Sequence, residues 1–234
     1  MLTGHPLSQA NAQVVNAAAS GLPQLTSQQK EGTLELVNII EAGGVIESAM
    51  SLPIALDHLA EFIWRRQFRL VGSRALLVDP LAPVRLTEGP ADAERRFAAY
   101  RCRNGQFRSL AISCLIPMND AVFYVIPGRH KANLPLPFDA SWLDSIEPLV
   151  EMTVPRGAAV LFTESLSRTI KPPVSETDGW LLYQNGTSYM ANWPGCDPSP
   201  ELRARTVDDP DKRHLMLEPY YHPTGAYRRK SSEE

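Results

Sequence analysis

The chain has 234 residues, a length typical of one domain with an added segment. Apolar residues make up 44% of it and charged residues 21%, which is ordinary for a globular protein and excludes a wholly disordered chain. The formal net charge of −3 gives no basic footprint of the kind that nucleic-acid-binding proteins set against phosphates. We therefore expect no nucleic-acid partner.

The sequence also gives no signal for membrane insertion or export. No run approaches the ~18 apolar residues of a membrane-spanning helix, and residues 1–21 have neither the basic nor the apolar stretch of a signal peptide. The cysteines Cys102, Cys114 and Cys196 lie far apart without paired spacing, so neither a disulfide framework nor a zinc site is indicated. We expect a cytoplasmic protein without membrane association.

The N-terminal part of the chain is predicted to be an arm followed by helices. Residues 1–25, rich in Ala, Asn, Gln and Ser, are expected to form a flexible arm, and residues 26–66 a helical layer. A first helix from Ser27 is indicated by apolar residues at three- to four-residue spacing, namely Leu34, Val37 and Ile40. Pro53 is typical of the first turn of a second helix that continues to Arg66.

Short strands separated by turns are predicted for most of the remaining chain. Asn104-Gly105 is the strongest short hairpin signal, because both residues accept the positive φ of a tight turn. A short helix is expected at 139–146, another near the C-terminus, and a disordered tail at 226–234. The predicted fold is mainly β with flanking α-helices. Its expected strands are Phe68–Val78, Tyr100–Arg103, Gln106–Ile116, Ala121–Ile126, Leu149–Val154, Ala158–Thr163 and Trp180–Ala191.

Two segments carry a resemblance to a known family. Phe123–Asn133 reads as a strand, a Pro-Gly turn and a basic loop, and Val154–Leu166 as a turn, a buried strand and a polar end. Both resemble the phytanoyl-CoA dioxygenase-like family of non-haem iron, 2-oxoglutarate-dependent oxygenases, and Leu217–Tyr221 resembles a C-terminal stretch of some members. The resemblance implies a double-stranded β-helix, or jelly roll, over residues 67–225. It also implies a small organic substrate, with secondary metabolism as the expected setting.

The sequence departs from the family where the family binds its cofactors. Arg168 stands where the resemblance places a metal-binding histidine, and a guanidinium has no lone pair to give a metal. No histidine occurs between His58 and His130, where the other one belongs, and Asp178 lies near the place of the arginine that binds 2-oxoglutarate. We therefore expect neither Fe(II) nor 2-oxoglutarate, unless Glu88, Asp120 or His130 replaces the missing ligands.

The first functional hypothesis is a pseudo-oxygenase: a metal-independent enzyme that catalyses a cyclisation, isomerisation or dehydration. Arg168 would stabilise negative charge, and Glu164 or Tyr183 would transfer protons. The residues expected to line the substrate site are Arg101, Arg103, Tyr189 and Trp180. A simpler interpretation is that Arg168 and Glu164 form a salt bridge that fills an empty site.

Two further hypotheses remain open at this point. One is a non-catalytic protein that binds a small molecule, forms a homo-oligomer or associates with an active relative. Exposed apolar side chains at Leu34, Ile40, Ile54 or Phe62 would support this hypothesis. The other is a working Fe(II)/2-oxoglutarate dioxygenase with relocated ligands.

Overall fold

The computed structural model describes residues 26–30, 33–63, 67–78, 100–128, 149–164, 166–171 and 178–216. The predicted arm at 1–25, the helix at 139–146 and the tail at 226–234 lie outside these residues.

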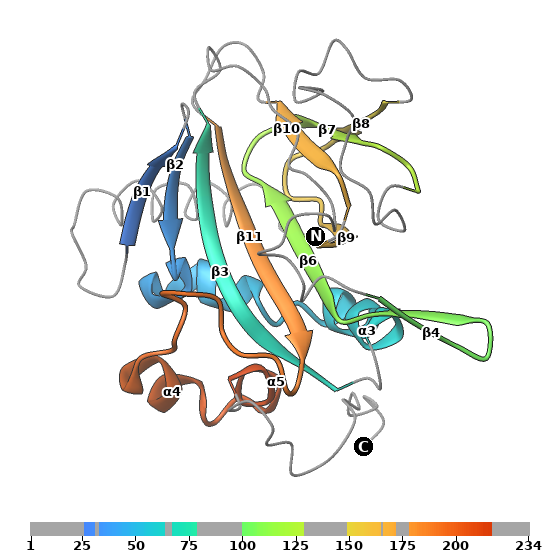
Figure 1. Ribbon diagram of the computed structural model, residues 1–234. Coiled ribbons are helices and arrows are strands. Elements are labelled where there is room, and N and C mark those ends of the chain that lie inside the picture. Colours follow the sequence, from blue (N-terminus) through green and yellow to red (C-terminus); the bar gives the residue numbers. More distant parts are fainter. Residues whose placement is uncertain are drawn as a thin grey trace.

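The largest element is a six-stranded antiparallel sheet (Figure 1). Across the sheet the strands run in the order β1 (Thr26–Lys30), β2 (Thr33–Val37), β3 (Phe68–Val78), β11 (Asp178–Thr187), β6 (Ala111–Pro117) and β9 (Val160–Thr163). The long central strands β3 and β11 pair along ten residues of β11, with one β-bulge at Gln184/Asn185. This pairing places a strand from the first half of the chain beside a strand from the second half.

A smaller sheet lies against the upper part of the large one (Figure 1). Its antiparallel strands run in the order β10 (Arg168–Lys171), β7 (Ala121–Val125) and β8 (Val150–Val154). From β6 onward the chain passes repeatedly between the two sheets: β6 is in the large one, β7 and β8 in the small one, β9 in the large one, β10 in the small one and β11 in the large one. The fold is mainly β and compatible with a jelly roll.

The predicted hairpin is confirmed. β4 (Tyr100–Arg103) and β5 (Gln106–Ser109) form a separate two-stranded ribbon joined by Asn104 and Gly105. Both turn residues have positive φ, 52° and 74°, as a tight hairpin turn that matches the twist of its strands requires.

The helices pack on the face of the large sheet that lies away from the small one. They are η1 (Ile39–Ala42), α2 (Gly44–Ala49), α3 (Pro53–Phe62), α4 (Pro200–Thr206) and α5 (Pro210–Leu215). One apolar core joins them to the sheet, with buried residues such as Ile46, Leu59, Leu181, Leu202 and Leu215. A second core lies between the two sheets and contains Leu115, Phe123, Phe162, Trp180 and Leu182. No helix in the described ranges is long and apolar enough to cross a membrane.

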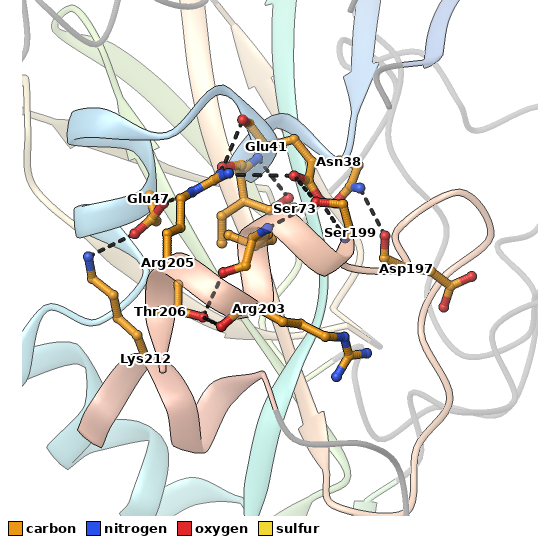
Figure 2. A network of polar contacts seen from close by, with 12 residues as sticks. Asn38, Glu41, Glu47, Ser73, Asp197, Ser199, Arg203, Arg205, Thr206 and Lys212 are labelled. Carbon is orange, nitrogen blue, oxygen red and sulfur yellow. Dashed lines mark hydrogen bonds and ion pairs between the residues drawn. The ribbon is translucent and has the colours of Figure 1, made fainter. Parts of the chain in front are cut away.

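A polar network ties the last two helices to the first ones (Figure 2). Glu41 accepts hydrogen bonds from the backbone N–H and the hydroxyl of Ser199, at 2.7 and 2.8 Å. Arg205 donates to the backbone carbonyls of Ile40 and Glu41 at 3.3 and 3.2 Å, so it caps the end of η1. Glu47 accepts hydrogen bonds from Arg205 and Lys212, so α2 is tied to both α4 and α5.

The prediction of a helix from Ser27 is wrong, because residues 26–30 and 33–37 pair as the antiparallel strands β1 and β2. All five residues of β2 pair with β3, whose edge offers backbone hydrogen bonds that local sequence spacing does not reveal. The apparent helical spacing of Leu34, Val37 and Ile40 combined the end of a strand with the start of η1. The second predicted helix is confirmed as α3 up to Phe62.

Candidate functional site

The candidate site lies on the face of the large sheet that looks toward the small sheet. Four residues from adjacent strands stand opposite one another there: Gly72 on β3, Gln184 on β11, Ser113 on β6 and Phe162 on β9. Leu182 and Leu115, each two positions from Gln184 and Ser113 along the same strands, belong to the core between the sheets. Because side chains alternate along a strand, Gln184 and Ser113 face the same interior as Leu182 and Leu115.

Glu164 brings a carboxylate to this row. It follows β9, two residues beyond Phe162, and only 2% of it is exposed. Its Oε1 accepts hydrogen bonds from the Ser113 hydroxyl and from Gln184 Nε2, the latter at 3.2 Å. A buried carboxylate needs such donors, because water cannot solvate it.

Arg168 supplies the positive charge that balances Glu164. It is the first residue of β10 and stands opposite Val125 at the end of β7. Its Nη2 lies 3.3 Å from Glu164 Oε2, and its Nη1 donates to the carbonyls of Leu166 and Glu164 at 3.0 and 3.4 Å. The guanidinium also covers the ring of Phe162, 4.2 Å from its centroid. Glu164, Arg168, Ser113 and Gln184 are called the interior polar cluster below.

A second ion pair lies farther along the same face. Arg74 on β3 stands opposite Leu182 and pairs with Glu35 of β2. Its guanidinium lies 5.6 Å from the ring centroid of Trp193. Trp193 in turn lies close to Gly72, next to the interior polar cluster. Arg168 and Arg74 therefore each have a carboxylate partner within the chain.

The structure brings the predicted Arg168 and Glu164 together but places Tyr183 elsewhere. Tyr183 precedes Gln184 and therefore points to the other face of the sheet, where its hydroxyl donates to the carbonyl of Ile46 at 2.7 Å. Burial raises the pKa of Tyr183 well above its ordinary value, with a smaller contribution from Cys114. The phenol joins β11 to α2 and has no contact with the interior polar cluster that could carry a proton.

The predicted substrate-lining residues have different positions. Trp180 is fully buried between the sheets, and its Nε1 has no hydrogen-bond partner within the described chain. Tyr189 is 38% exposed after the end of β11. Arg101 and Arg103 lie on β4, whose pairing partner is β5, and their side chains lie outside the described residues.

Sequence reasoning missed Ser113 and Gln184. Ser113 is a hydroxyl within a buried apolar strand, Ala-Ile-Ser-Cys-Leu-Ile, and Gln184 ends the apolar run Trp-Leu-Leu-Tyr. A polar residue at an interior position of a buried strand is the signal that could have found them. Their common target, Glu164, becomes visible only when β6, β9 and β11 are paired.

The described residues do not fit an iron ligand set at this place. Nowhere in the described ranges do three His, Cys, Asp or Glu residues gather in a way that could hold a metal ion. Glu164 is the single carboxylate of the interior polar cluster, and three donors from the protein already bind it. Asp120 accepts from the Arg156 backbone at the other end of β7, about 17 Å along the strand from the level of Arg168. Glu88 and His130 lie outside the described residues.

No protein-family profile matches the sequence, and no curated protein does either. Solved structures do match. Apo HygX from Streptomyces hygroscopicus has 15% sequence identity and a TM-score of 0.66 over 86% of both chains. The epimerase SnoN, solved with Fe3+, alpha ketoglutarate and nogalamycin RO, has 14% identity and a TM-score of 0.56 over 85% of this chain and 82% of SnoN. The carbocyclase SnoK from nogalamycin biosynthesis has 12% identity and a TM-score of 0.57 over 83% and 81%.

The chain shares its fold with HygX, SnoN and SnoK, of which SnoN and SnoK are described as non-heme alpha ketoglutarate dependent enzymes. HygX has also been solved with nickel and 2-oxoglutarate, and with iron. At these identities the likeness shows the fold alone, which confirms that part of the expected resemblance. The interior polar cluster is a property of this chain and has to be interpreted from its own residues.

Proposed function

We propose that this protein is a metal-independent, non-oxidative enzyme that acts on an uncharged small molecule of secondary metabolism. The observation that supports this most is the buried ion pair of Arg168 with Glu164. It lies where the resemblance to the oxygenases would put a metal-binding imidazole, and a guanidinium cannot take that role.

We also propose that the fold is a double-stranded β-helix. The alternation of the chain between the sheets supports this, as does the arrangement of β3, β11, β6 and β9 as direct neighbours in the large sheet. The site would then lie between the sheets, which is a usual place for a ligand in such a fold.

Glu164 is the candidate proton acceptor. A carboxylate offers about four lone-pair positions, and protein donors take three of them here, so one position on the side of Oε2 is left for a ligand. Arg168 would stabilise negative charge that develops on the ligand close to Glu164. A proton that leaves one atom of the ligand and returns to another produces an isomer, so this chemistry requires no oxidant.

The residues between the two sheets and the known ligands of structurally similar proteins together suggest which class of ligand to propose. Phe123, Phe162 and Trp180 form an aromatic interior, and the unpartnered Nε1 of Trp180 can donate to a ligand oxygen. SnoN and SnoK are an epimerase and a carbocyclase of nogalamycin biosynthesis, and HygX has been solved with hygromycin B. We therefore propose a secondary metabolite with hydroxyl or carbonyl groups as the ligand.

A test of this function uses thermal shifts with uncharged polycyclic and carbohydrate-derived metabolites, followed by mass spectrometry of any ligand found. Conversion to a product of equal mass, or one lighter by a water, in the presence of a chelator is the expected result. Glu164→Gln should reduce the rate at least 100-fold, about 2.7 kcal/mol of barrier, while the exposed Glu201→Gln serves as the matched control. A product that carries an added oxygen atom, formed together with succinate, would contradict the proposal.

The second candidate is a non-catalytic binding protein or a partner of an active relative. Two observations favour it: the donors around Glu164 are already satisfied, and Ile54 and Phe62 on α3 are 61% and 52% exposed. The other two residues named for this hypothesis give less support, because Ile40 is buried and Leu34 partly buried. Binding without conversion, together with self-association in sedimentation velocity that Ile54→Glu abolishes, would favour this candidate over the enzyme.

The third candidate is an Fe(II)/2-oxoglutarate dioxygenase whose metal ligands come from positions such as Glu88 and His130. The neighbours solved with iron, nickel or 2-oxoglutarate support this alternative. Direct measurement of iron binding decides between it and the proposed function.

A further inference from the structure

Glu164 is bound in the way that proteins bind a free carboxylate. Three side chains from three different strands converge on it: Ser113 from β6, Gln184 from β11 and Arg168 from β10. A cation on one oxygen and neutral donors on the other form a receptor for one negative charge. Arg168 is only 9% exposed and Gln184 4%, so the receptor is buried.

The receptor side chains come from strands other than the turn that carries Glu164, and Arg168 also donates to the Leu166 and Glu164 carbonyls, which a substitution of the Glu164 side chain leaves in place. Ser113 and Gln184 are directly opposite each other in the pairing of β6 with β11, and Arg168 is held by the pairing of β10 with β7. The Gln184 amide also packs closely against Gly72, since a Cβ at that position would come 2.7 Å from its Oε1. Glu164 itself stands in the turn that follows β9. Removing its side chain therefore leaves the donors in place.

We infer that Glu164 is the built-in occupant of a carboxylate-binding site formed by Arg168, Ser113 and Gln184. The site thereby excludes free carboxylates such as 2-oxoglutarate from this position and leaves the interior to an uncharged ligand. The statement about the ligand rests on the proposed function, whereas the carboxylate site stands on the contacts alone. The anion that Arg168 binds is then part of the chain itself.

Glu164→Ala provides the test. The substitution removes Cγ, Cδ and both oxygens, a group with the size and charge of acetate. We expect the variant to lose thermal stability and to regain it in sodium acetate but not in sodium chloride at equal ionic strength. At ten times the dissociation constant of acetate, the expected gain in Tm is about 3–6 °C. The wild type and Glu164→Gln, in which the space stays filled, should gain nothing from acetate.

The control is the double variant Glu164→Ala/Arg168→Met, which keeps the space and removes the cation. It should show no acetate effect. If Glu164→Ala does not accumulate as a folded protein, its refolding yield from urea in acetate against chloride gives the same information. An acetate effect that is equal in the wild type, that persists without Arg168, or that is missing in the folded Glu164→Ala variant would overturn the inference.

The same experiment with 2-oxoglutarate tests exclusion. Wild-type protein without added metal should show no thermal shift with 2-oxoglutarate, and a shift that Arg168→Met abolishes would contradict the assignment. None of these measurements depends on a substrate or on turnover. A failure of the proposed enzyme function would therefore leave the acetate result unchanged, and the two outcomes can be separated.

Discussion

Gly72 on β3 leaves the space into which the amide of Gln184 packs. A Cβ at position 72 would lie 2.7 Å from Gln184 Oε1 and 3.0 Å from Trp193 Cδ1. The same amide donates from Nε2 to Glu164. The absence of a side chain at Gly72 on β3 thus permits the position of Gln184 on β11, whose amide binds Glu164.

The first prediction concerns this relationship. Gly72→Ala should destabilise the protein by about 1–3 kcal/mol, because overpacking forces Gln184 out of its position. Urea unfolding measures the effect. In a Gln184→Ala background the same substitution should cost clearly less, since the clashing oxygen is then absent. Equal costs in the two backgrounds would show that Gly72 and Gln184 are not coupled.

The second prediction concerns the ion pair. Arg168→Met should reduce stability by roughly 3–5 kcal/mol, because it leaves the Glu164 carboxylate buried without its cation. The double variant Arg168→Met/Glu164→Gln should recover part of this loss, since no uncompensated charge remains. Denaturant unfolding of both variants and of the exposed Arg156→Met control gives the comparison. A double variant less stable than Arg168→Met would speak against a paired charge.

The third prediction concerns the contact between α2 and the last two helices (Figure 2). Burial alone would raise the pKa of Glu47, but hydrogen bonds and charge from Arg205 and Lys212 outweigh it and lower the pKa below its ordinary value of 4.5. A lowered carboxyl pKa gives stability that is present above about pH 4.5 and is lost as the pH falls through the folded-state value. Arg205→Met should therefore lower Tm more at pH 7 than near pH 3, where only the loss of its hydrogen bonds to the carbonyls of Ile40 and Glu41 remains. A constant difference across this range would contradict the account.

The fourth prediction concerns His214 on α5. Its ring meets Phe68 edge-on with centroids 5.7 Å apart, and burial lowers the pKa of His214 below its ordinary value of 6.5, partly opposed by a hydrogen bond with the Phe68 backbone. Folding then requires the neutral ring, so its contribution is complete above pH 6.5 and is lost as the pH falls below that value. Tm measured between pH 7.5 and pH 5 should fall less for His214→Gln than for the wild type. An unchanged slope would contradict this role.

Local signals in the sequence predicted a large part of the fold. Phe68–Val78 was expected as a strand and is β3, and Asn104-Gly105 forms the expected turn because both residues tolerate positive φ. The hairpin of β1 and β2 was not predicted, because its stabilisation comes from pairing with β3, a partner far along the chain. The four-residue strand β10 was missed for the same reason, since it is defined by its pairing with β7.

The candidate site was predicted in part. The contact of Glu164 with Arg168 was weighed as a salt bridge from the sequence, and the structure brings the two side chains together. Tyr183 was expected beside them, but the alternation of side chains along β11 turns it to the helical face. Ser113 and Gln184 contact Glu164 across 51 and 20 residues of sequence, and no local pattern reports such distances. The sheet register brings them together.

The measurement that tests the central claim most directly is an anaerobic titration of the purified protein with Fe(II) and 2-oxoglutarate. Bound iron and the visible charge-transfer band of the iron–2-oxoglutarate complex are recorded together. We predict no stoichiometric iron and no band, because under the proposed function the ion pair of Arg168 with Glu164 stands in place of a metal ligand. One iron per chain with a charge-transfer band would contradict the account and favour an Fe(II)/2-oxoglutarate enzyme with relocated ligands.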